Sequence, residues 1–315
     1  MEMKTMEFKN LEKWKSTLDN CIRCGYCYEH CPLTKFTRWE SDAPRAKMSM
    51  LFGMLSGELE PSSYIAEKLF SCFYCQRCVA ACSSGVPITE VFTDARADFV
   101  GTEFEMPGTT SVTGPNCVAC LACVRACPHE ARSFENGVVV TDKVKCQGCG
   151  ICVDVCPRQT IEIKTGYGTD RKYLDNEVTR FLAKDNAKAA IFACNWSYYP
   201  DLQTAEEGPF DGEAPEYKIF VNLCGGRLEK TQLIEPFLNS AWGVLVACCP
   251  DGDCEHDGNV KAKSHVAYLR AAMEAMDISP DRLKVVQIAH GDKAGFQTEI
   301  DTFMEDINSL GPLIP

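Results

Sequence analysis

Residues 117–156 read CVACLACVRACPHEARSFENGVVVTDKVKCQGCGICVDVC, and this stretch decides how the middle of the chain folds. It opens with four cysteines separated by two, two and three residues, and the same run closes it. The segment SFENGVVVTDK between the runs predicts short strands. Two more copies stand earlier in the chain. The sixteen cysteines of the four runs are Cys21, Cys24, Cys27, Cys31, Cys72, Cys75, Cys78, Cys82, Cys117, Cys120, Cys123, Cys127, Cys146, Cys149, Cys152 and Cys156.

The spacing of these runs is the ligand pattern of bacterial-type proteins that hold two [4Fe–4S] clusters. Three closely spaced thiolates bind three irons of one cluster. The fourth thiolate lies too far along the chain and reaches a neighbouring cluster. Sixteen thiolates therefore predict four [4Fe–4S] clusters and a protein that carries electrons.

Two other uses of cysteine fit the chain less well. A disulfide scaffold is typical of short secreted proteins, whereas this chain has 315 residues and opens with MEMKTMEFKNLEKWKSTLDN, which lacks the apolar core of a secretory signal. Structural zinc usually takes two separated CxxC pairs, four ligands in all. The runs of this chain, with three cysteines at a spacing of three and a fourth four residues on, suit an iron–sulfur cluster better than zinc. Reduced thiolates and labile clusters favour a reducing, anaerobic cytoplasm.

Charge and hydropathy narrow the choice of partners. The formal net charge of −12 disfavours nucleic acid, whose binding depends on clustered Lys and Arg. No apolar stretch approaches the roughly 20 residues of a membrane helix. We therefore expect no direct membrane span, and any membrane role would have to come through a partner.

The two pairs of cysteine runs differ in their internal spacing. Cys21 and Cys72 lie 51 positions apart, whereas Cys117 and Cys146 lie 29 apart. The short spacing fits a compact ferredoxin with strands in SFENGVVVTDK and QTIEIKT. The long spacing leaves room for helices, which we expect in DAPRAKMSMLFGMLSG and PSSYIAEKLFSCF. Residues 101–116 are rich in Gly, Thr and Pro and predict a linker.

In the last third of the chain, apolar segments that alternate with helical ones replace the cysteine runs. AKAAIFAC, YKIFVNLC, WGVLVACC and LKVVQIA predict buried strands, and LEKTQLIEPFLNSA, VKAKSHVAYLRAAMEAM and AGFQTEIDTFMEDINSL predict helices between or after them. Such alternation favours a parallel α/β sheet. TDRKYLDNEVTRFLAKDN leads into this part as a second linker or a helix, and the acidic DLQTAEEGPFDGEAPE predicts a solvated loop.

We therefore expect an α+β multidomain protein. Residues 1–105 form a helical domain with two [4Fe–4S] clusters, residues 106–168 form a bacterial-type ferredoxin domain with two more, and residues 186–315 form an α/β domain with a parallel sheet.

Five further cysteines lie where the predicted strands of the last third end: Cys194, Cys224, Cys248, Cys249 and Cys254. In open parallel sheets, sites gather at the carboxyl ends of the strands. Four cysteines delivered from spread positions suit a [2Fe–2S] cluster. Free buried cysteine is the alternative, above all for Cys248, which would belong to its strand while Cys249 leaves it.

These motifs resemble known families. CIRCGYCYEHCP and CFYCQRCVAACSSGVP are similar to the C component of heterodisulfide reductase, a helical two-cluster ferredoxin, and DAPRAKMSMLFGMLSGEL also resembles the iron–sulfur subunits of glycolate and lactate oxidising systems. Residues 115–166 resemble a two-cluster ferredoxin. FACNW, VNLCGGR and VLVACCPDGDCEHDGN resemble the delta subunit of methyl-viologen-reducing hydrogenase, a family that binds a [2Fe–2S] cluster.

The chain departs from these families at a few positions. Ser197 replaces a second cysteine of the hydrogenase delta family, which favours Cys194 as the ligand. A glycine commonly stands at the position of Cys248, and a histidine at that of Pro250. Ser83 replaces the proline that usually follows the fourth cysteine of a run, although this loss removes no ligand.

The resemblances imply five ligand sets. Under the ferredoxin rule, each fourth cysteine binds the other cluster of its pair. The first cubane takes Cys21, Cys24, Cys27 and Cys82, and the second takes Cys72, Cys75, Cys78 and Cys31. The third takes Cys117, Cys120, Cys123 and Cys156, and the fourth takes Cys146, Cys149, Cys152 and Cys127. The [2Fe–2S] cluster takes Cys194, Cys224, Cys249 and Cys254.

Backbone N–H groups near the clusters are expected to tune their potentials. Five glycines next to the cysteines could leave such groups free for sulfur, or could be ordinary turn glycines: Gly25, Gly148, Gly150, Gly225 and Gly226. His256 could hydrogen-bond the [2Fe–2S] cluster or be a solvated loop residue.

The resemblances imply an electron-transfer subunit of a cytoplasmic, flavin-based electron-bifurcating complex. Its partners would be a protein resembling the flavin subunit of heterodisulfide reductase, a protein resembling the B component of that enzyme, and a hydrogenase or formate dehydrogenase. We expect no flavin on this chain and no active site of its own. Two alternatives stay open: an accessory iron–sulfur subunit of a hydroxyacid or methylene-tetrahydrofolate oxidoreductase, and a free polyferredoxin carrier.

Overall fold

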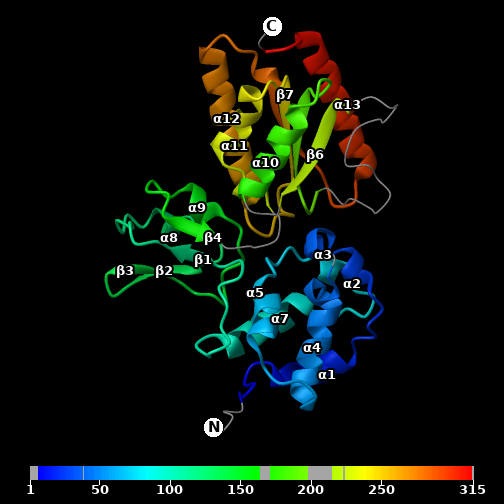
Figure 1. Cartoon of the computed structure of the whole chain (residues 1–315), viewed down its shortest axis with the longest axis vertical. Coiled ribbons are helices and arrows are strands. Elements are labelled where there is room, and N and C mark those ends of the chain that lie inside the picture. The colour runs from blue at the N-terminus through cyan, green and yellow to red at the C-terminus, as the bar shows by residue number, and fades with distance from the viewer. Residues whose placement is uncertain (1–5, 38, 164–170, 198–214, 223, 314–315) are drawn as a thin grey trace. The chain divides into compact units, whose positions relative to one another are not determined.

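The computed structural model describes residues 6–37, 39–163, 171–197, 215–222 and 224–313 (Figure 1). Contacts divide the chain into two compact units. The first unit is Met1–Gly148 with Val155–Gly168, and the second is Cys149–Asp154 with Thr169–Pro315. The expected boundary at residue 105 lies inside the first unit, and the division into three domains stays a prediction.

The first part of the first unit is helical, as expected. Its elements are η1 (Glu12–Trp14), α1 (Lys15–Asp19), α2 (Tyr26–Glu29), α3 (Pro32–Thr37), η2 (Glu40–Asp42), α4 (Pro44–Ser56), α5 (Ser63–Phe70), α6 (Arg77–Ala80) and α7 (Ile88–Phe99). Proline at the first position of α4 suits a helix start, and Gly57 ends that helix with φ +76°. The side chain of Ser62 caps α5 by accepting the N–H of Ile65.

These helices bury one apolar core. Leu51 of α4, Leu69 and Phe70 of α5, and Phe92 and Phe99 of α7 are fully buried in it. Most of the cysteines of the first two runs pack in or against this core, so the predicted cluster ligands sit on a rigid scaffold.

Among the residues described up to Ile163, the second part of the first unit contains two antiparallel strand pairs. Strands β2 (Arg132–Glu135) and β3 (Val138–Thr141) pair, and β1 (Ser111–Thr113) pairs with β4 (Ile161–Ile163). The short helix α8 (Ala122–Arg125) carries the third cysteine of its run. Strand β1 corrects the expected linker at 101–116. Its three residues are stabilised by a partner about fifty positions away, which local composition does not reveal.

Within the part of the chain that the structure describes, the second unit contains an all-parallel sheet of four strands, which confirms the expected α/β architecture. The strands are β5 (Ala189–Cys194), β6 (Tyr217–Asn222), β7 (Gly243–Cys248) and β8 (Leu283–Gln287), and their order in the sheet is β6-β5-β7-β8. The register pairs Cys194 with Asn222 and Cys248 with Gln287. The carboxyl ends of the strands, where the predicted ligands stand, therefore lie at one edge.

Helices cover both faces of this sheet (Figure 1). One face packs against α10 (Arg171–Leu182), α11 (Lys230–Leu238) and α12 (Gly258–Ala275), and the other packs against α13 (Lys293–Leu310). The short helices η3 (Gly225–Arg227), η4 (Pro280–Arg282) and α9 (Ile151–Asp154) complete the unit. Helix α10 resolves the choice between linker and helix for its segment.

The expected acidic loop at 201–216 lies outside the described residues, apart from its last two positions. Among the helices of the described chain, none is long and apolar enough to cross a membrane.

Candidate iron–sulfur sites

The four cysteine runs share one backbone conformation. The residue before the second cysteine and the residue after it have positive φ in every run, with values between 52° and 89°. These residues are Arg23, Gly25, Tyr74, Gln76, Ala119, Leu121, Gly148 and Gly150. The third cysteine of each run then lies in a helix of one turn, α2, α6, α8 or α9. Non-glycine residues rarely adopt positive φ, yet Arg23, Tyr74, Gln76, Ala119 and Leu121 do so in the first three runs, which indicates a shared functional geometry.

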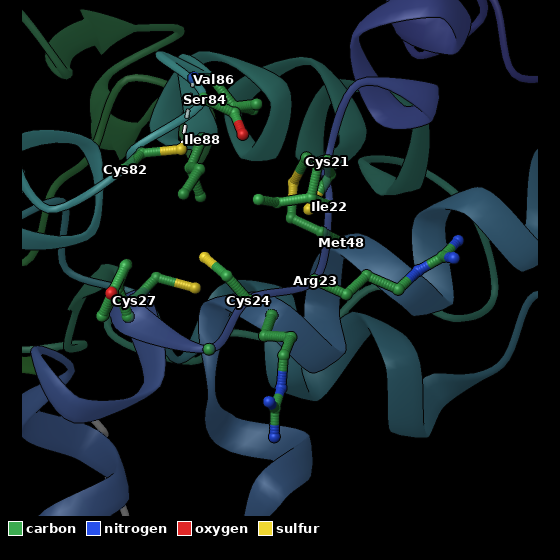
Figure 2. Close-up of a pocket in the computed structure, with 13 residues that line it drawn as sticks. Cys21, Ile22, Arg23, Cys24, Cys27, Met48, Cys82, Ser84, Val86 and Ile88 are labelled. Atoms are coloured by element: carbon green, nitrogen blue, oxygen red, sulfur yellow. Dashed lines mark hydrogen bonds between the residues drawn. The ribbon is translucent and has the colours of Figure 1, made fainter.

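The first hollow is lined by the four thiols predicted for the first cubane (Figure 2). They are Cys21, Cys24, Cys27 and Cys82, and the hollow encloses about 370 Å³, part of it open to solvent. Burial, together with the neighbouring thiols, raises the pKa of Cys27 to about 11. Closely spaced thiols form a donor set that becomes stable as thiolates when iron supplies the positive charge.

The second hollow is lined by Cys31, Cys72, Cys75 and Cys78, again with the fourth cysteine of the opposite run. Burial raises the pKa of Cys75 to about 12 and also raises the pKa of Cys31. Two buried cations, Lys47 and Arg77, line the same hollow. Their charge favours thiolates and bound anionic clusters over neutral thiols.

The third hollow is lined by Cys117, Cys120, Cys123 and Cys156. It repeats the crossed arrangement inside the ferredoxin part. The cysteines of the fourth predicted set belong to both compact units: Cys127 and Cys146 lie in the first, and Cys149 and Cys152 lie in the second. That set stays a prediction from the spacing of the runs.

Backbone N–H groups point at several of these sulfur atoms. The donors are Tyr74 to Cys72 at 3.5 Å, Val86 to Cys82 at 3.3 Å, Ala119 to Cys117 at 3.4 Å, Ala131 to Cys127 at 3.3 Å and Ser111 to Cys146 at 3.4 Å. None of these donors is a glycine. Of the five glycines considered from the sequence, Gly226 has a backbone that acts to lower the pKa of Cys224, although Cys254 and burial raise that pKa overall. Such bonds to sulfur raise the reduction potential of a bound cluster.

The carboxyl edge of the parallel sheet gathers four of the five late cysteines. The Sγ atoms of Cys194 and Cys249 lie 3.6 Å apart. The thiols of Cys224 and Cys249 lower the pKa of Cys254. Cys254 in turn raises the pKa of Cys224, and Cys194 together with Cys254 raises the pKa of Cys249. The backbone at His256 and Asn259, around the start of α12, also acts to lower the pKa of Cys254. The four thiols can therefore surround one small cluster.

Cys248 faces a different environment from its neighbour Cys249. Its thiol donates to the carbonyl of Val286 at 3.5 Å and packs in the apolar core under α12. Burial raises the pKa of Cys248 to about 12. His256, considered as a solvated loop residue, is instead buried, with 5% of its surface exposed.

The segment Cys149–Asp154 packs against η3 within the second unit. The Asp154 carboxylate accepts from Lys261 at 2.6 Å and contacts His265 Nε2 at 3.2 Å. Burial alone would raise the pKa of Asp154, but these two partners outweigh it and hold the pKa at about 2. The packing is tight, because a Cβ at Gly226 would lie 3.2 Å from Ile151. It places Cys149 close enough to Cys224 to influence that thiol electrostatically.

Sequence reasoning missed the buried cations of the second hollow. Lys47 is 1% exposed and stands on the same face of α4 as Leu51 and Met54, at positions i, i+4 and i+7. A lysine on an otherwise apolar helix face is the signal that could have identified it.

Three family matches cover most of the chain. Residues 17–86 and residues 116–160 each match a 4Fe-4S dicluster domain, and residues 189–311 match the methyl-viologen-reducing hydrogenase delta subunit. We call the last of these three parts the delta domain. The two dicluster matches include all sixteen cysteines of the four runs.

Curated relatives agree with this division. The D component of the F420-non-reducing hydrogenase vhc of Methanococcus voltae, an iron–sulfur subunit, is 30% identical over 126 residues, which are 40% of this chain and 87% of the relative. The probable glycolate oxidase iron–sulfur subunit of Bacillus subtilis is 30% identical over 97 residues, 30% of this chain and 22% of the relative.

The C component of the ferredoxin:CoB-CoM heterodisulfide reductase of Methanosarcina acetivorans is 35% identical over 75 residues, 24% of this chain and 27% of the relative. The family matches, the relatives and the gathered thiols agree on the chemistry. The chain therefore belongs to the family of the methyl-viologen-reducing hydrogenase delta subunit, and it is an iron–sulfur electron-transfer subunit in which two 4Fe-4S dicluster domains precede the delta domain.

Proposed function

We propose that this chain relays electrons through four [4Fe–4S] clusters and one [2Fe–2S] cluster between a dehydrogenase and a flavin subunit of one large complex. Each bound cluster would exchange one electron at a time. The protein residues would hold the clusters and set their potentials.

The crossed thiol sets carry this proposal. Three hollows each gather three cysteines of one run with the fourth cysteine of its partner run, which is the arrangement that two-cluster ferredoxins require. The residues fit the clusters, because soft thiolates at this spacing select iron–sulfur clusters. Cys194, Cys224, Cys249 and Cys254 would supply the fifth set, and the 3.6 Å between the Sγ atoms of Cys194 and Cys249 supports this proposal.

Solvent exposure suggests where electrons enter and leave. Cys24 and Cys120 are exposed, whereas Cys31 and Cys78 of the second set are buried. Ile22 beside Cys24 is 69% exposed, and Val118 beside Cys120 is 60% exposed. Exposed apolar side chains beside an accessible cluster are suited to docking a redox partner. The first and third clusters would therefore face partners, and the second would carry electrons inside the protein.

The partners are proposed from the relatives. One relative is a subunit of an F420-non-reducing hydrogenase and another is a subunit of a heterodisulfide reductase. By analogy, a hydrogenase or formate dehydrogenase would deliver electrons near the delta domain. A protein resembling the flavin subunit of heterodisulfide reductase would split electron pairs, and a protein resembling the B component of that enzyme would contact the helical domain. Labile clusters on thiolates favour a reducing, anaerobic cytoplasm.

Native purification tests this proposal. The tagged chain, expressed in its own host and purified anaerobically at low salt, is expected to bring a flavoprotein with it in a fixed ratio. Flavin fluorescence of the denatured eluate and mass spectrometry of its bands give the readout. A chain that elutes alone at every ionic strength would contradict the subunit role and favour a free polyferredoxin.

The glycolate oxidase relative supports a second candidate. Its iron–sulfur subunit matches 30% of this chain, so the chain could be the accessory subunit of a hydroxyacid oxidoreductase. A methylene-tetrahydrofolate oxidoreductase would be a related case. The same purification separates these candidates. A co-purifying flavoprotein that reduces the chain with lactate or glycolate would support the second candidate, and reduction with hydrogen or formate would support the first.

A further inference from the structure

We propose that the side chain of Arg96 bridges the binding sites of the second and fourth clusters. It hydrogen-bonds the backbone of one predicted cysteine ligand of each cluster and raises both reduction potentials. The proposal rests on the cluster assignments given above. It concerns a buried guanidinium that none of the cysteine motifs contains.

Arg96 donates to the backbone of both cysteine runs. Its side chain is fully buried in α7. The Nη2 atom donates to the carbonyl of Cys72, and Nη1 donates to the carbonyl of Cys146 at 3.4 Å. Nε and Nη2 also donate to the carbonyl of Leu69, at 3.2 and 2.9 Å. One side chain therefore links a predicted ligand of the second cluster with a predicted ligand of the fourth.

Further contacts fix the guanidinium in place. It lies over the ring of Tyr74 at 4.5 Å and over that of Phe70 at 5.1 Å. Thr109 strengthens the same junction, because its hydroxyl donates to the carbonyls of Phe70 and Cys72 at 3.1 and 3.0 Å. The arrangement leaves Arg96 little freedom, so its charge has a defined position relative to both runs.

The charge of Arg96 lacks an ordinary counter-ion. Among the described residues, no carboxylate forms an ion pair with it, although a fully buried cation is costly unless it is paired. Backbone carbonyls supply dipoles but no negative charge. Bound thiolate clusters are anionic, and they would provide the missing negative charge.

This position predicts a shared electrostatic effect. A fixed positive charge stabilises the more negative, reduced form of a nearby cluster and so raises its reduction potential. Since Arg96 contacts both runs, it should raise both potentials together. If both clusters are bound, one electron that passes across this junction would oxidise one cluster and reduce the other, with no bond made or broken and no proton required.

Lys47 provides a matched comparison, because it serves only one of the two clusters. It lines the hollow of the second set and lowers the pKa of Cys31 electrostatically, against the larger effect of burial. Among the described residues, it has no hydrogen bond to the fourth run. The variant Lys47→Met should therefore move one potential, and it assigns that signal to the second cluster.

The test is an anaerobic redox titration of the full chain with its clusters bound, followed by electron paramagnetic resonance. In Arg96→Gln, two cluster signals should move to lower potential, one of them the signal that moves in Lys47→Met. We expect at least a tenfold fall in the reduced-to-oxidised ratio at fixed potential, which is 59 mV for one electron. Arg96→Lys, which keeps the charge, should recover more than half of each shift.

A variant of a second buried arginine tests whether the shifts in potential come from a general loss of packing. Arg282 is also buried and donates to the carbonyls of Trp242, Leu310 and Gly311, with no cysteine among them. Arg282→Gln should leave all cluster potentials unchanged. Equal shifts in this variant, or an Arg96→Gln protein in which only one signal or none moves, would overturn the proposal.

The iron content of Arg96→Gln is measured as well, because this variant could lose clusters instead of shifting their potentials. If Arg96→Gln loses clusters, a loss of about eight irons supports a shared role, since two cubanes hold that number. A loss of about four contradicts it. If the wild-type protein itself shows no cubane signals, the proposed function fails, and that result is recognisable without any variant.

Discussion

Cys248 and Cys249 show how neighbouring residues of one type take different roles. Cys248 is the last residue of β7 and points into the apolar core, where its thiol donates to the carbonyl of Val286. Cys249 leaves the strand, and its sulfur lies 3.6 Å from that of Cys194. The alternation of side chains along a strand explains the difference. The sequence suggested this choice, and the contacts support Cys249 as the ligand.

Substitution of each cysteine separates the two roles. Cys249→Ser should lose the [2Fe–2S] cluster, so iron should fall by about two atoms per chain. Cys248→Ala should keep that iron and lose about 1 kcal/mol of unfolding free energy, because it removes one buried sulfur. Iron analysis and urea unfolding measure these effects. Loss of iron in Cys248→Ala alone would reverse the assignment.

Paired substitutions test the crossed ligation of the first two cubanes. Cys24 and Cys82 line one hollow, whereas Cys75 lines the other. Residues that serve one cluster should not have additive effects. We expect Cys24→Ser with Cys82→Ser to lose about four irons, and Cys75→Ser with Cys82→Ser to lose about eight. The opposite result would show that each run binds its own cluster with all four cysteines.

The start of α12 positions the thiols of the delta domain. Gly258 is the first residue of α12, and a Cβ there would lie 2.3 Å from the Sγ of Cys224 and 2.7 Å from the N of Gly226. The helix start can approach the thiols this closely only because it carries a glycine. The sequence showed the glycines after Cys224 but held no sign that a glycine over thirty positions later packs against the same sulfur.

Gly258→Ala should displace Cys224 and lose about two irons, with a cost of about 1–3 kcal/mol from overpacking. Gly252→Ala is the control from the same loop region. Its φ of +94° makes any side chain strained, but a Cβ there meets nothing within 4 Å. This control should keep its iron. A Gly258→Ala protein with full iron and an unchanged [2Fe–2S] signal would show that the close approach does not matter.

The Asp154 contacts anchor α9 to α12. The side chain of Asp154 is 7% exposed, and its partner Lys261 is 24% exposed. Asp154→Asn should lower the unfolding free energy by about 1–3 kcal/mol at neutral pH, where the carboxylate is ionised, since it leaves the partners of a largely buried pair unmatched. Urea unfolding followed by tryptophan fluorescence measures this change.

Asp251 offers the matched control for Asp154. It also pairs with a lysine, Lys263, at 2.5 Å, but its side chain is 66% exposed. Surface pairs contribute little to stability. Asp251→Asn should therefore leave unfolding unchanged, and equal effects of the two variants would mean that burial of Asp154 has no role.

The fold could be predicted in large part because its signals are local and repeated. The cysteine spacing identified the two dicluster parts, and alternating apolar runs and helices indicated the parallel sheet. Long-range features were missed. Strand β1 depends on β4, and Lys47 and Arg77 become significant only when α4 and α6 meet around one hollow. The grouping of Cys149–Asp154 with the second unit likewise depends on contacts from α12 and η3.

Iron and acid-labile sulfide analysis of the anaerobically purified chain tests the central claim most directly. Four cubanes and one binuclear cluster predict about 18 irons per chain, with a [2Fe–2S] signal on reduction. A value near 16 without that signal would contradict the site in the delta domain. A value near ten would mean that one pair of runs binds no clusters, and the account of the chain as a five-cluster electron relay would be wrong.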